Sequence, residues 1–431
     1  MATRQRALYW AVCFGHTTVD LLVSTGPVLM AFLASHILPM TNTQIGFAVS
    51  GFQLMGALSQ PFAGYLADKT GGRWLGAGGV VWVGFFLTLS LILSTTGIYA
   101  LMVIPYVTAA LGSGLFHPVG TMYAASGDKT RLARDLSVFF LMGQLGSGIG
   151  PVLMGALLDS AATHNIIFTS ALGPSLNGLL MEQGTVTPVL SLGLITLPIF
   201  LFMFLQIPNA HAHAESRRAS SSASSGKFAV GALAFLALVV TLRSLANPGI
   251  VAFLPRLFQL KGWSAAEYGL ITSLYWVSSG LAGVLFGNLA DRYGSRTVIA
   301  VSLLLGAPML FFLPSVDSFT ALLLAVAAGA LTGGSHSVIV AMTQRLMPAR
   351  KGLAGGLTLG FIFGTGALGT LIIGGLSDNV GLLTAFHIVA GVTLVTSLLA
   401  WWLPADRRTP TSAIALQNDV RVAGAQPEKA T

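Results

Sequence analysis

The chain has 431 residues, of which 54% are hydrophobic and only 8% are charged, and its mean hydropathy is +0.78. Soluble domains carry about 25% charged residues, so this composition excludes a water-soluble globular protein and indicates a chain that folds in a lipid bilayer. The net charge of +8 does not indicate a nucleic-acid partner, because basic residues of membrane proteins collect in their cytoplasmic loops.

Twelve stretches are apolar and long enough to cross a bilayer, which requires about 20 residues each. They are 8–36, 44–67, 74–95, 98–125, 134–158, 187–207, 228–255, 265–289, 297–315, 319–342, 352–376 and 381–403. The first stretch is too long for a cleaved signal sequence and contains His16 and Asp20, so we expect it to be retained as a helix. The mixed segment 160–186 is expected to be an outer loop.

The lysine and arginine residues favour one orientation of these spans. With the amino terminus in the cytoplasm, 19 of the 22 basic residues fall in cytoplasmic segments, Arg256 and Lys261 fall outside, and Arg243 lies within the seventh span. This asymmetry follows the positive-inside rule and supports an even number of spans. Both termini are therefore expected in the cytoplasm.

Composition also divides the chain into two halves. The segment 209–227 is polar and rich in serine and alanine, so we expect a flexible cytoplasmic linker there. It separates an amino-terminal half of six helices, 1–208, from a carboxyl-terminal half of six helices, 228–404. The polar tail, 405–431, is expected to be disordered in the cytoplasm.

One charged motif occurs twice between apolar stretches. The sequence G-Y-L-A-D-K-T-G-G-R occupies 64–73, and G-N-L-A-D-R-Y-G-S-R occupies 287–296. Each copy connects the second and third spans of its half. The chain is therefore expected to consist of two similar halves, and the distance along the chain between the two copies defines the offset of an internal repeat.

Twelve spans in two halves, a polar central linker and the doubled motif resemble the major facilitator superfamily over about residues 8–403. The resemblance implies an all-α membrane fold of two pseudo-symmetric six-helix halves, with a substrate site near the bilayer midplane. The segments G-L-F-H-P at 114–118 and G-S-H-S-V at 334–338 are similar to the fosmidomycin-resistance branch of drug-efflux transporters. These resemblances imply a transporter in a bacterial inner membrane.

The fifth span carries a G-x-x-x-G-P motif, with Gly150 and Pro151 at its end, that resembles a motif of superfamily antiporters. Small residues let two helices approach closely and proline bends a helix, so ordinary packing is the alternative interpretation. An arginine that drug/proton antiporters often carry in the fourth span is absent between Tyr99 and Ala125. A proton mechanism that uses this arginine therefore does not transfer to this chain.

The resemblance assigns the doubled motif to conformational gating. In each copy an aspartate closes a helix, where a carboxylate is stabilised by the positive end of a neighbouring helix. The expected gating residues are Gly64, Asp68, Arg73, Gly287, Asp291, Arg296, Gly150 and Pro151. The alternative for the basic members is that they only establish topology.

Two charged residues lie within apolar spans at equivalent positions. Asp20 lies in the first span and Arg243 in the seventh, separated by the same offset as the two copies of the motif. A charge at the bilayer centre costs about 2.5–3.5 kcal/mol on insertion scales, so each is a candidate functional residue. Either the two residues pair structurally across the cavity, or Asp20 carries the coupling proton and Arg243 holds an anionic substrate.

Three intramembrane histidines are candidates for proton coupling with Asp20. His16 lies one helical turn before Asp20 and shares its face, while His117 and His336 occupy the fourth and tenth spans. Histidine titrates near physiological pH and can relay protons; the alternative is a buried histidine bonded to a neighbouring group. Candidate substrate-binding residues besides Arg243 are Asn247, Gln53, Gln144, Tyr275 and Trp276. Asp159 and Asp378, which close the fifth and eleventh spans, are expected to cap helices or to face solvent.

The sequence contains no recognisable enzyme site. The chain has no G-x-x-x-x-G-K motif for ATP, no recognisable nucleophile and base, no cluster with metal-ligand spacing, and one cysteine, Cys13. We therefore expect no cofactor and no metal, and as partners a small-molecule substrate, protons and the lipid bilayer. The leading hypothesis is proton-coupled efflux by a monomer. The alternatives are a metabolite importer or uniporter of the same fold, and a membrane sensor that does not transport.

Overall fold

A computed structural model describes residues 3–126, 132–163, 192–208, 230–346 and 351–405. Within these residues the regular structure is helical, which agrees with the expected all-α class. The predicted linker, 209–227, lies outside the described residues, as do most of the predicted outer loop and all but the first residue of the predicted tail. The boundaries of the two predicted halves therefore remain predictions.

The helices of the amino-terminal half follow the expected order. They are α1 (Thr3–Ser24), α2 (Gly26–His36), α3 (Asn42–Thr70), α4 (Arg73–Ser94), α5 (Tyr99–Ala124), α6 (Leu132–Thr163) and α9 (Thr196–Gln206). Together α1 and α2 form the first expected span. Proline is tolerated in the first turn of α2, because that position needs no intrahelical N–H bond.

The carboxyl-terminal half repeats this order. Its helices are α10 (Val230–Leu260), α11 (Ala265–Tyr293), α12 (Ser295–Phe312) with the 3₁₀ turn η3 (Leu313–Ser315), α13 (Ser318–Ala328), the π-helix η4 (Gly329–Gly333), α14 (Ser335–Leu346), α15 (Lys351–Val380) and α16 (Leu382–Ala400). The tenth expected span thus contains a π-helix between α13 and α14, which the sequence analysis did not predict.

Each of the twelve expected spans contains helix. Ten helical segments of the described chain are long and apolar enough to cross a membrane. The more polar α3, with 29 residues, and the shorter α9 occupy the places of the second and sixth spans. Large apolar side chains also cover the outer surface: Trp74 is 70%, Val284 71% and Phe319 70% exposed. Such a surface suits lipid and not water.

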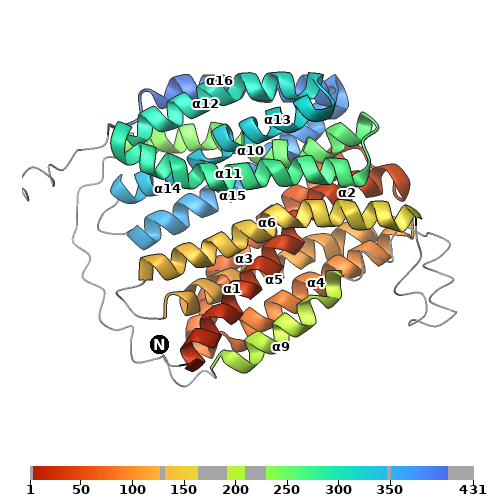
Figure 1. Cartoon of the computed structure of the whole chain (residues 1–431), viewed down its shortest axis with the longest axis vertical. Helices are drawn as coiled ribbons and strands as arrows, with labels where there is room; N and C mark the ends of the chain where they lie inside the picture. Colours follow the sequence, from red (N-terminus) through yellow and green to blue (C-terminus); the bar gives the residue numbers. More distant parts are fainter. Residues whose placement is uncertain (1–2, 127–131, 164–191, 209–229, 347–350, 406–431) are drawn as a thin grey trace, which may run out of the picture.

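The two halves lie side by side (Figure 1), with the red-to-lime helices mostly in the lower part and the green-to-blue helices in the upper part. They meet where α6 packs on α11, α3 on α15, and α2 on α10. The doubled motif lies where α3 meets α4 and where α11 meets α12; we call this the motif end. The opposite end, which carries the starts of α3 and α11 and the ends of α6 and α15, is the far end.

Candidate functional site

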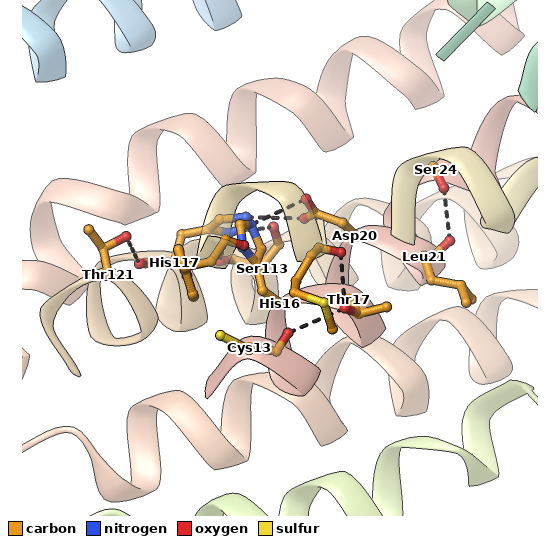
Figure 2. A network of polar contacts seen from close by, with 11 residues as sticks. Cys13, His16, Thr17, Asp20, Leu21, Ser24, Ser113, His117 and Thr121 are labelled. Carbon is orange, nitrogen blue, oxygen red and sulfur yellow. Dashed lines mark hydrogen bonds and ion pairs between the residues drawn. The ribbon is translucent and has the colours of Figure 1, made fainter. Parts of the chain in front are cut away.

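Asp20 lies between two histidines in the interior of the amino-terminal half (Figure 2). Its Oδ2 is 3.3 Å from Nε2 of His16, one turn earlier on α1, and its Oδ1 is 3.2 Å from Nε2 of His117 on α5. The spacing of four residues places His16 and Asp20 on one face of α1. We call His16, Asp20 and His117 the Asp20 triad.

The other ring nitrogens of both histidines bind backbone carbonyl groups. Nδ1 of His16 lies 2.8 Å from the carbonyl oxygen of Phe139 on α6, and Nδ1 of His117 lies 2.7 Å from that of Ser113 on its own helix. A carbonyl oxygen only accepts, so each Nδ1 carries a hydrogen. In a neutral ring the Nε2 atom that faces Asp20 then has a lone pair and no hydrogen.

With this tautomer, the two Nε2 contacts of Asp20 can become hydrogen bonds only if protons are added. An ionised carboxylate that faces two unprotonated Nε2 atoms has nothing to donate, so neither contact is then a hydrogen bond. One added proton completes one of the two bonds, and a second proton completes the other. Each of the two contacts with Asp20, at 3.3 and 3.2 Å, is thus a site where an added proton would be shared between an imidazole and the carboxylate.

The Asp20 triad is enclosed on the His16 side and partly open on the other. The His16 side chain is almost fully buried and stacks on the Phe139 ring with a centroid distance of 4.2 Å. Gly143 of α6 covers the pair, because an added Cβ there would lie 2.7 Å from Oδ2 of Asp20. The side chains of Asp20 and His117 retain 19% and 26% exposure, so neither is fully enclosed by the protein.

Arg243 on α10 is the corresponding buried charge of the other half, and it is only 5% exposed. Its Nε donates to Oγ of Ser335 at 2.8 Å, and its Nη2 donates to the carbonyl oxygens of Thr332 and Gly333 at 2.9 and 3.1 Å. The π-helix supplies these two carbonyl groups. No carboxylate neutralises Arg243 among the described residues, because its recorded partners are a hydroxyl group and two backbone oxygens.

Further polar side chains surround this guanidinium. The hydroxyl groups of Tyr275 and Thr332 lie 2.8 Å apart, and Asn247 donates to the same Thr332 oxygen at 3.1 Å. Arg243, Asn247 and Thr332 also line a small cavity between α10, α12, the π-helix and α16. An unpaired cation beside hydroxyl and amide groups is suited to binding an anion.

Asp20 and Arg243 do not pair in the described structure. The recorded partners of each residue lie within its own half: His16 and His117 for Asp20, and residues 332, 333 and 335 for Arg243. Of the two alternatives left open by the sequence, a direct ion pair is absent from this conformation. Each of the two charges is thus surrounded by groups of its own half.

The sequence model of the Major Facilitator Superfamily matches residues 12–264 and 236–423, which together span most of the chain. The chain belongs to the major facilitator superfamily. Its members are transporters and not enzymes, in agreement with the absence of a recognisable enzyme motif.

Two relatives are similar to this chain over almost its full length. The fosmidomycin resistance protein of Escherichia coli (strain K12) is 26% identical over 404 residues, covering 92% of each chain. An uncharacterised transporter of the superfamily, YfnC of Bacillus subtilis (strain 168), is 25% identical over 409 residues, covering 91% of each. The class B tetracycline resistance protein of Escherichia coli is 28% identical over 182 residues, which is 40% of this chain and 45% of that protein.

Solved structures of the superfamily share this fold. A bacterial homologue of the human lysosomal transporter Spinster, in an inward-facing and occupied conformation, superposes with a TM-score of 0.68 at 14% identity and covers 92% of this chain and 93% of its own. The inward-open xylose transporter XylE from E. coli gives a TM-score of 0.68 at 15% identity, covering 95% and 99%. At these identities the similarity establishes the fold alone.

The remaining predicted binding residues are scattered. Gln144 on α6 is exposed and lies near Gly280 of α11, whereas Gln53 on α3 is partly buried. The indole N–H of Trp276 is buried without a recorded acceptor. His336 follows Ser335 directly and is an electrostatic neighbour of Arg243, so it lies with the Arg243 cluster and not with Asp20.

The predicted gating residues have different surroundings. Arg73 donates from Nε to the carbonyl oxygen of Ile207 at 2.7 Å, which ties the start of α4 to the end of α9 within one half. Asp291 and Arg296 are exposed, Gly64 and Gly287 are partly buried, and the side chain of Asp68 lies outside the described set. An added Cβ at Gly150 would collide with Leu21 and Ser24 of α1, and the Pro151 carbonyl group faces Gly269 of α11.

Several residues of the site were not found from the sequence. Phe139 and Ser113 act through their carbonyl groups, which any residue could provide, and Gly143 acts by having no side chain. Their positions depend on how α6 and α5 pack on α1. Thr332 could have been found only if the π-helix had been predicted.

The possible metal-ligand atoms of the Asp20 triad, two imidazole nitrogens and a carboxylate oxygen, all lie within 4.8 Å of one another, a spacing that would also suit a metal ion.

Proposed function

We propose that this transporter is a proton-coupled antiporter that exports a small organic anion by alternating access. The supporting observation is the Asp20 triad, whose two Nε2 atoms face one carboxylate, so that its contacts become hydrogen bonds only when protons are bound. A relative named for fosmidomycin resistance matches along nearly the whole chain, and relatives named for multidrug and tetracycline resistance match shorter parts. These relatives favour efflux over import.

The proton load controls the geometry of the Asp20 triad. Protonation replaces unfavourable contacts between lone pairs and a carboxylate with charge-assisted hydrogen bonds, each contributing about 1.5–3 kcal/mol. The Asp20–His117 bond joins α1 to α5, the Asp20–His16 bond lies within α1, and the His16–Phe139 bond joins α1 to α6. Gain or loss of protons therefore changes the relative stability of arrangements of these three helices, which is what a population shift requires.

Arg243 is the proposed contact for the substrate. Its charge has no recorded carboxylate partner, so an anionic group of the substrate would complete its electrostatic environment. A phosphonate antibiotic is the first candidate, because a full-length relative carries the name of fosmidomycin resistance. Asn247, Tyr275, Trp276, Gln53 and Gln144 are proposed to contact other parts of the substrate, and His336 to act with Arg243 or as a second proton site.

The proposed environment is the bacterial inner membrane, with both termini in the cytoplasm. The distribution of lysine and arginine supports this orientation, with the motif end inside. The working unit is proposed to be a monomer that needs no nucleic acid and no cofactor.

Proton flux in everted membrane vesicles tests the proposal. Respiration acidifies the vesicle lumen, and a pH-sensitive dye then reports proton release when a compound from a panel including fosmidomycin is added. We expect proton release with the native protein, and at least tenfold slower release with Asp20→Asn or Arg243→Gln. Asp20→Asn removes the proton-binding carboxylate, and Arg243→Gln removes the unpaired cation.

Matched controls separate these effects from general damage. His36→Gln changes a histidine that bonds within its own helix, and Arg4→Gln changes an exposed cation; both are expected to retain full flux. Each measurement is repeated with a chelator, which distinguishes protons from a metal ion at the Asp20 triad. Full activity of both Asp20→Asn and Arg243→Gln would refute the assignment. Flux of the opposite sign would favour the importer, and binding without flux the sensor.

A further inference from the structure

Two aspartates connect the halves at the far end of the molecule. Asp159, near the end of α6, accepts hydrogen bonds from the backbone N–H groups of Ala265 and Ala266, at 2.8 and 2.9 Å. Asp378, near the end of α15, accepts them from Asn42 and Thr43, both at 2.8 Å. Each aspartate thus caps the first turn of a helix that belongs to the other half.

The two contacts are related by the internal repeat. Asn42 and Ala265, which start α3 and α11, are separated by the same offset as the two copies of the doubled motif. On the other side of each contact the chain reads G-x-x-x-D, with Asp159 preceded by Gly155 and Asp378 by Gly374. The aspartate sides are 219 residues apart and the helix starts 223, so both sides of the interface recur in the two halves with a small shift in spacing.

The local helix caps explain why an aspartate fits at each position. Thr41 with Gln44, and Ser264 with Glu267, form capping boxes in which each side chain binds the backbone of the other residue. A capping box satisfies the N–H groups of the N-cap and third helical positions, so those of the first two positions remain free. The carboxylate of Asp378 or Asp159 accepts from these two groups and lies at the positive end of the helix.

Close helix packing accompanies each contact. An added Cβ at Gly155 would collide with the carbonyl oxygen of Ala265, and one at Gly374 would lie 2.6 Å from that of Asn42. Hydroxyl groups add one more bond between halves on each side: Ser50 donates to the Ala367 carbonyl oxygen at 2.6 Å, and the Val152 N–H donates to Ser273 at 2.9 Å. Ser50 and Ser273 are again equivalent positions of the internal repeat.

The glycines described near the motif end of α11 and α15 make no comparable contacts. A Cβ added at Gly287 of α11, or at Gly360 or Gly364 of α15, would meet nothing within 4 Å. Among the described residues, the glycine contacts that bring α6 against α11 and α3 against α15 backbone to backbone are therefore those near the far end.

We propose that Asp159 and Asp378 form a symmetric clamp that holds the far end closed, and that both contacts must release before the substrate site can open there. The two aspartates are proposed as positioning residues, because they bind the helix starts of the other half and lie away from the Asp20 triad and Arg243. If the halves rock as bodies, they cannot separate at the far end while one contact holds. The clamp depends on the transporter fold and not on which ion or substrate is used.

Distances between spin labels test the clamp directly. In a Cys13→Ala background, labels at Thr96 and Phe319 report the far end, and labels at Thr70 and Tyr293 report the motif end; all four positions are exposed. We expect Asp378→Asn or Asp159→Asn to raise the ratio of far-end-open to far-end-closed molecules about tenfold, since each removes a charge-assisted contact. The double variant is expected to raise it about a hundredfold, with a matching decrease in the motif-end distance.

A nearby aspartate provides the control. Asp317 is exposed at the same end and pairs with Lys261 of its own half at 3.1 Å, so Asp317→Asn makes the same change of charge without touching the interface. Thr43→Val, which removes only the hydroxyl bond to Asp378, is a milder variant in case the double variant does not fold. It is expected to raise the open ratio by a few fold.

Unchanged distances in folded Asp159→Asn, Asp378→Asn and Thr43→Val, indistinguishable from Asp317→Asn, would overturn the clamp. The measurement needs neither substrate nor a proton gradient. Failure of the clamp is therefore distinguishable from failure of the proposed antiport, which the vesicle assay measures.

Discussion

At the scale of single residues, the three side chains of the Asp20 triad are linked by direct contacts. The carboxylate contacts both imidazole rings, so a change at one residue alters the surroundings of the others. Substitutions within the triad are therefore expected to be non-additive, because removing one member changes the environment of the rest. Arg243 has no such dependence on Asp20, since its recorded partners belong to the other half.

Gly143→Ala is expected to disturb the triad without removing any of its functional groups. The new Cβ would lie 2.5 Å from His16 Nε2 and 2.7 Å from Asp20 Oδ2, so the His16–Asp20 contact must shift. We expect at least tenfold slower proton release in everted vesicles. Gly78→Ala is the matched control, because a Cβ there meets nothing within 4 Å and alanine favours the helix by about 1 kcal/mol. Equal flux of the two variants would show that Gly143 does not shape the site.

At the scale of helices, the π-helix explains how a buried arginine is tolerated. The π-helix replaces the backbone hydrogen bonds of an α-helix with bonds between residues five apart. Its Thr332 and Gly333 carbonyl oxygens accept hydrogen bonds from the Arg243 guanidinium. Glycine is needed here for a second reason: a Cβ at Gly329 would collide with the Tyr275 carbonyl oxygen of α11, and one at Gly333 with the Ser279 hydroxyl group. The same short segment therefore holds Arg243 on one side and packs against α11 on the other.

Ser335→Ala tests this support for Arg243. The substitution removes the acceptor of the Nε–H group inside the protein, which should lower the free energy of unfolding by about 1–3 kcal/mol. The midpoint of thermal unfolding in detergent is the measurement. Ser302→Ala, whose hydroxyl group bonds only within α12, should lower the stability by less than about 1 kcal/mol. Similar midpoints for the two variants would mean that Ser335 does not stabilise the arginine.

At the scale of the whole molecule, the fold was more predictable than the site. The length of the apolar stretches and the distribution of lysine and arginine were sufficient to predict the positions of the spans. The spacing of four residues was sufficient to place His16 beside Asp20. The contact of His117 with Asp20 was not predictable, because it depends on how α5 packs on α1. Asp159 and Asp378 were expected to cap helices or to face solvent, but that each caps a helix of the other half depends on the arrangement of the halves.

The orientation of the molecule can be measured with the same exposed positions. In a Cys13→Ala background, Phe319→Cys at the far end should react with an impermeant maleimide in intact cells. Tyr293→Cys at the motif end should react only after permeabilisation, because the proposed orientation, which follows the distribution of basic residues, puts that end in the cytoplasm. Labelling of Tyr293→Cys in intact cells would reverse the proposed orientation, and with it the assignment of the clamp to the outer side.

The length of α6 has a mechanical consequence. Phe139 and Gly143 of this helix contact the Asp20 triad, and Asp159 of the same helix holds the start of α11. Sixteen residues of helix separate Gly143 from Asp159, which corresponds to about 24 Å. A tilt of about 5° around the triad would therefore move the Asp159 carboxylate by about 2 Å, more than its 2.8 Å hydrogen bond to Ala265 can tolerate. If the proposed proton binding tilts α6 about the Asp20 triad, a lever of this length would release the Asp159 contact at the far end.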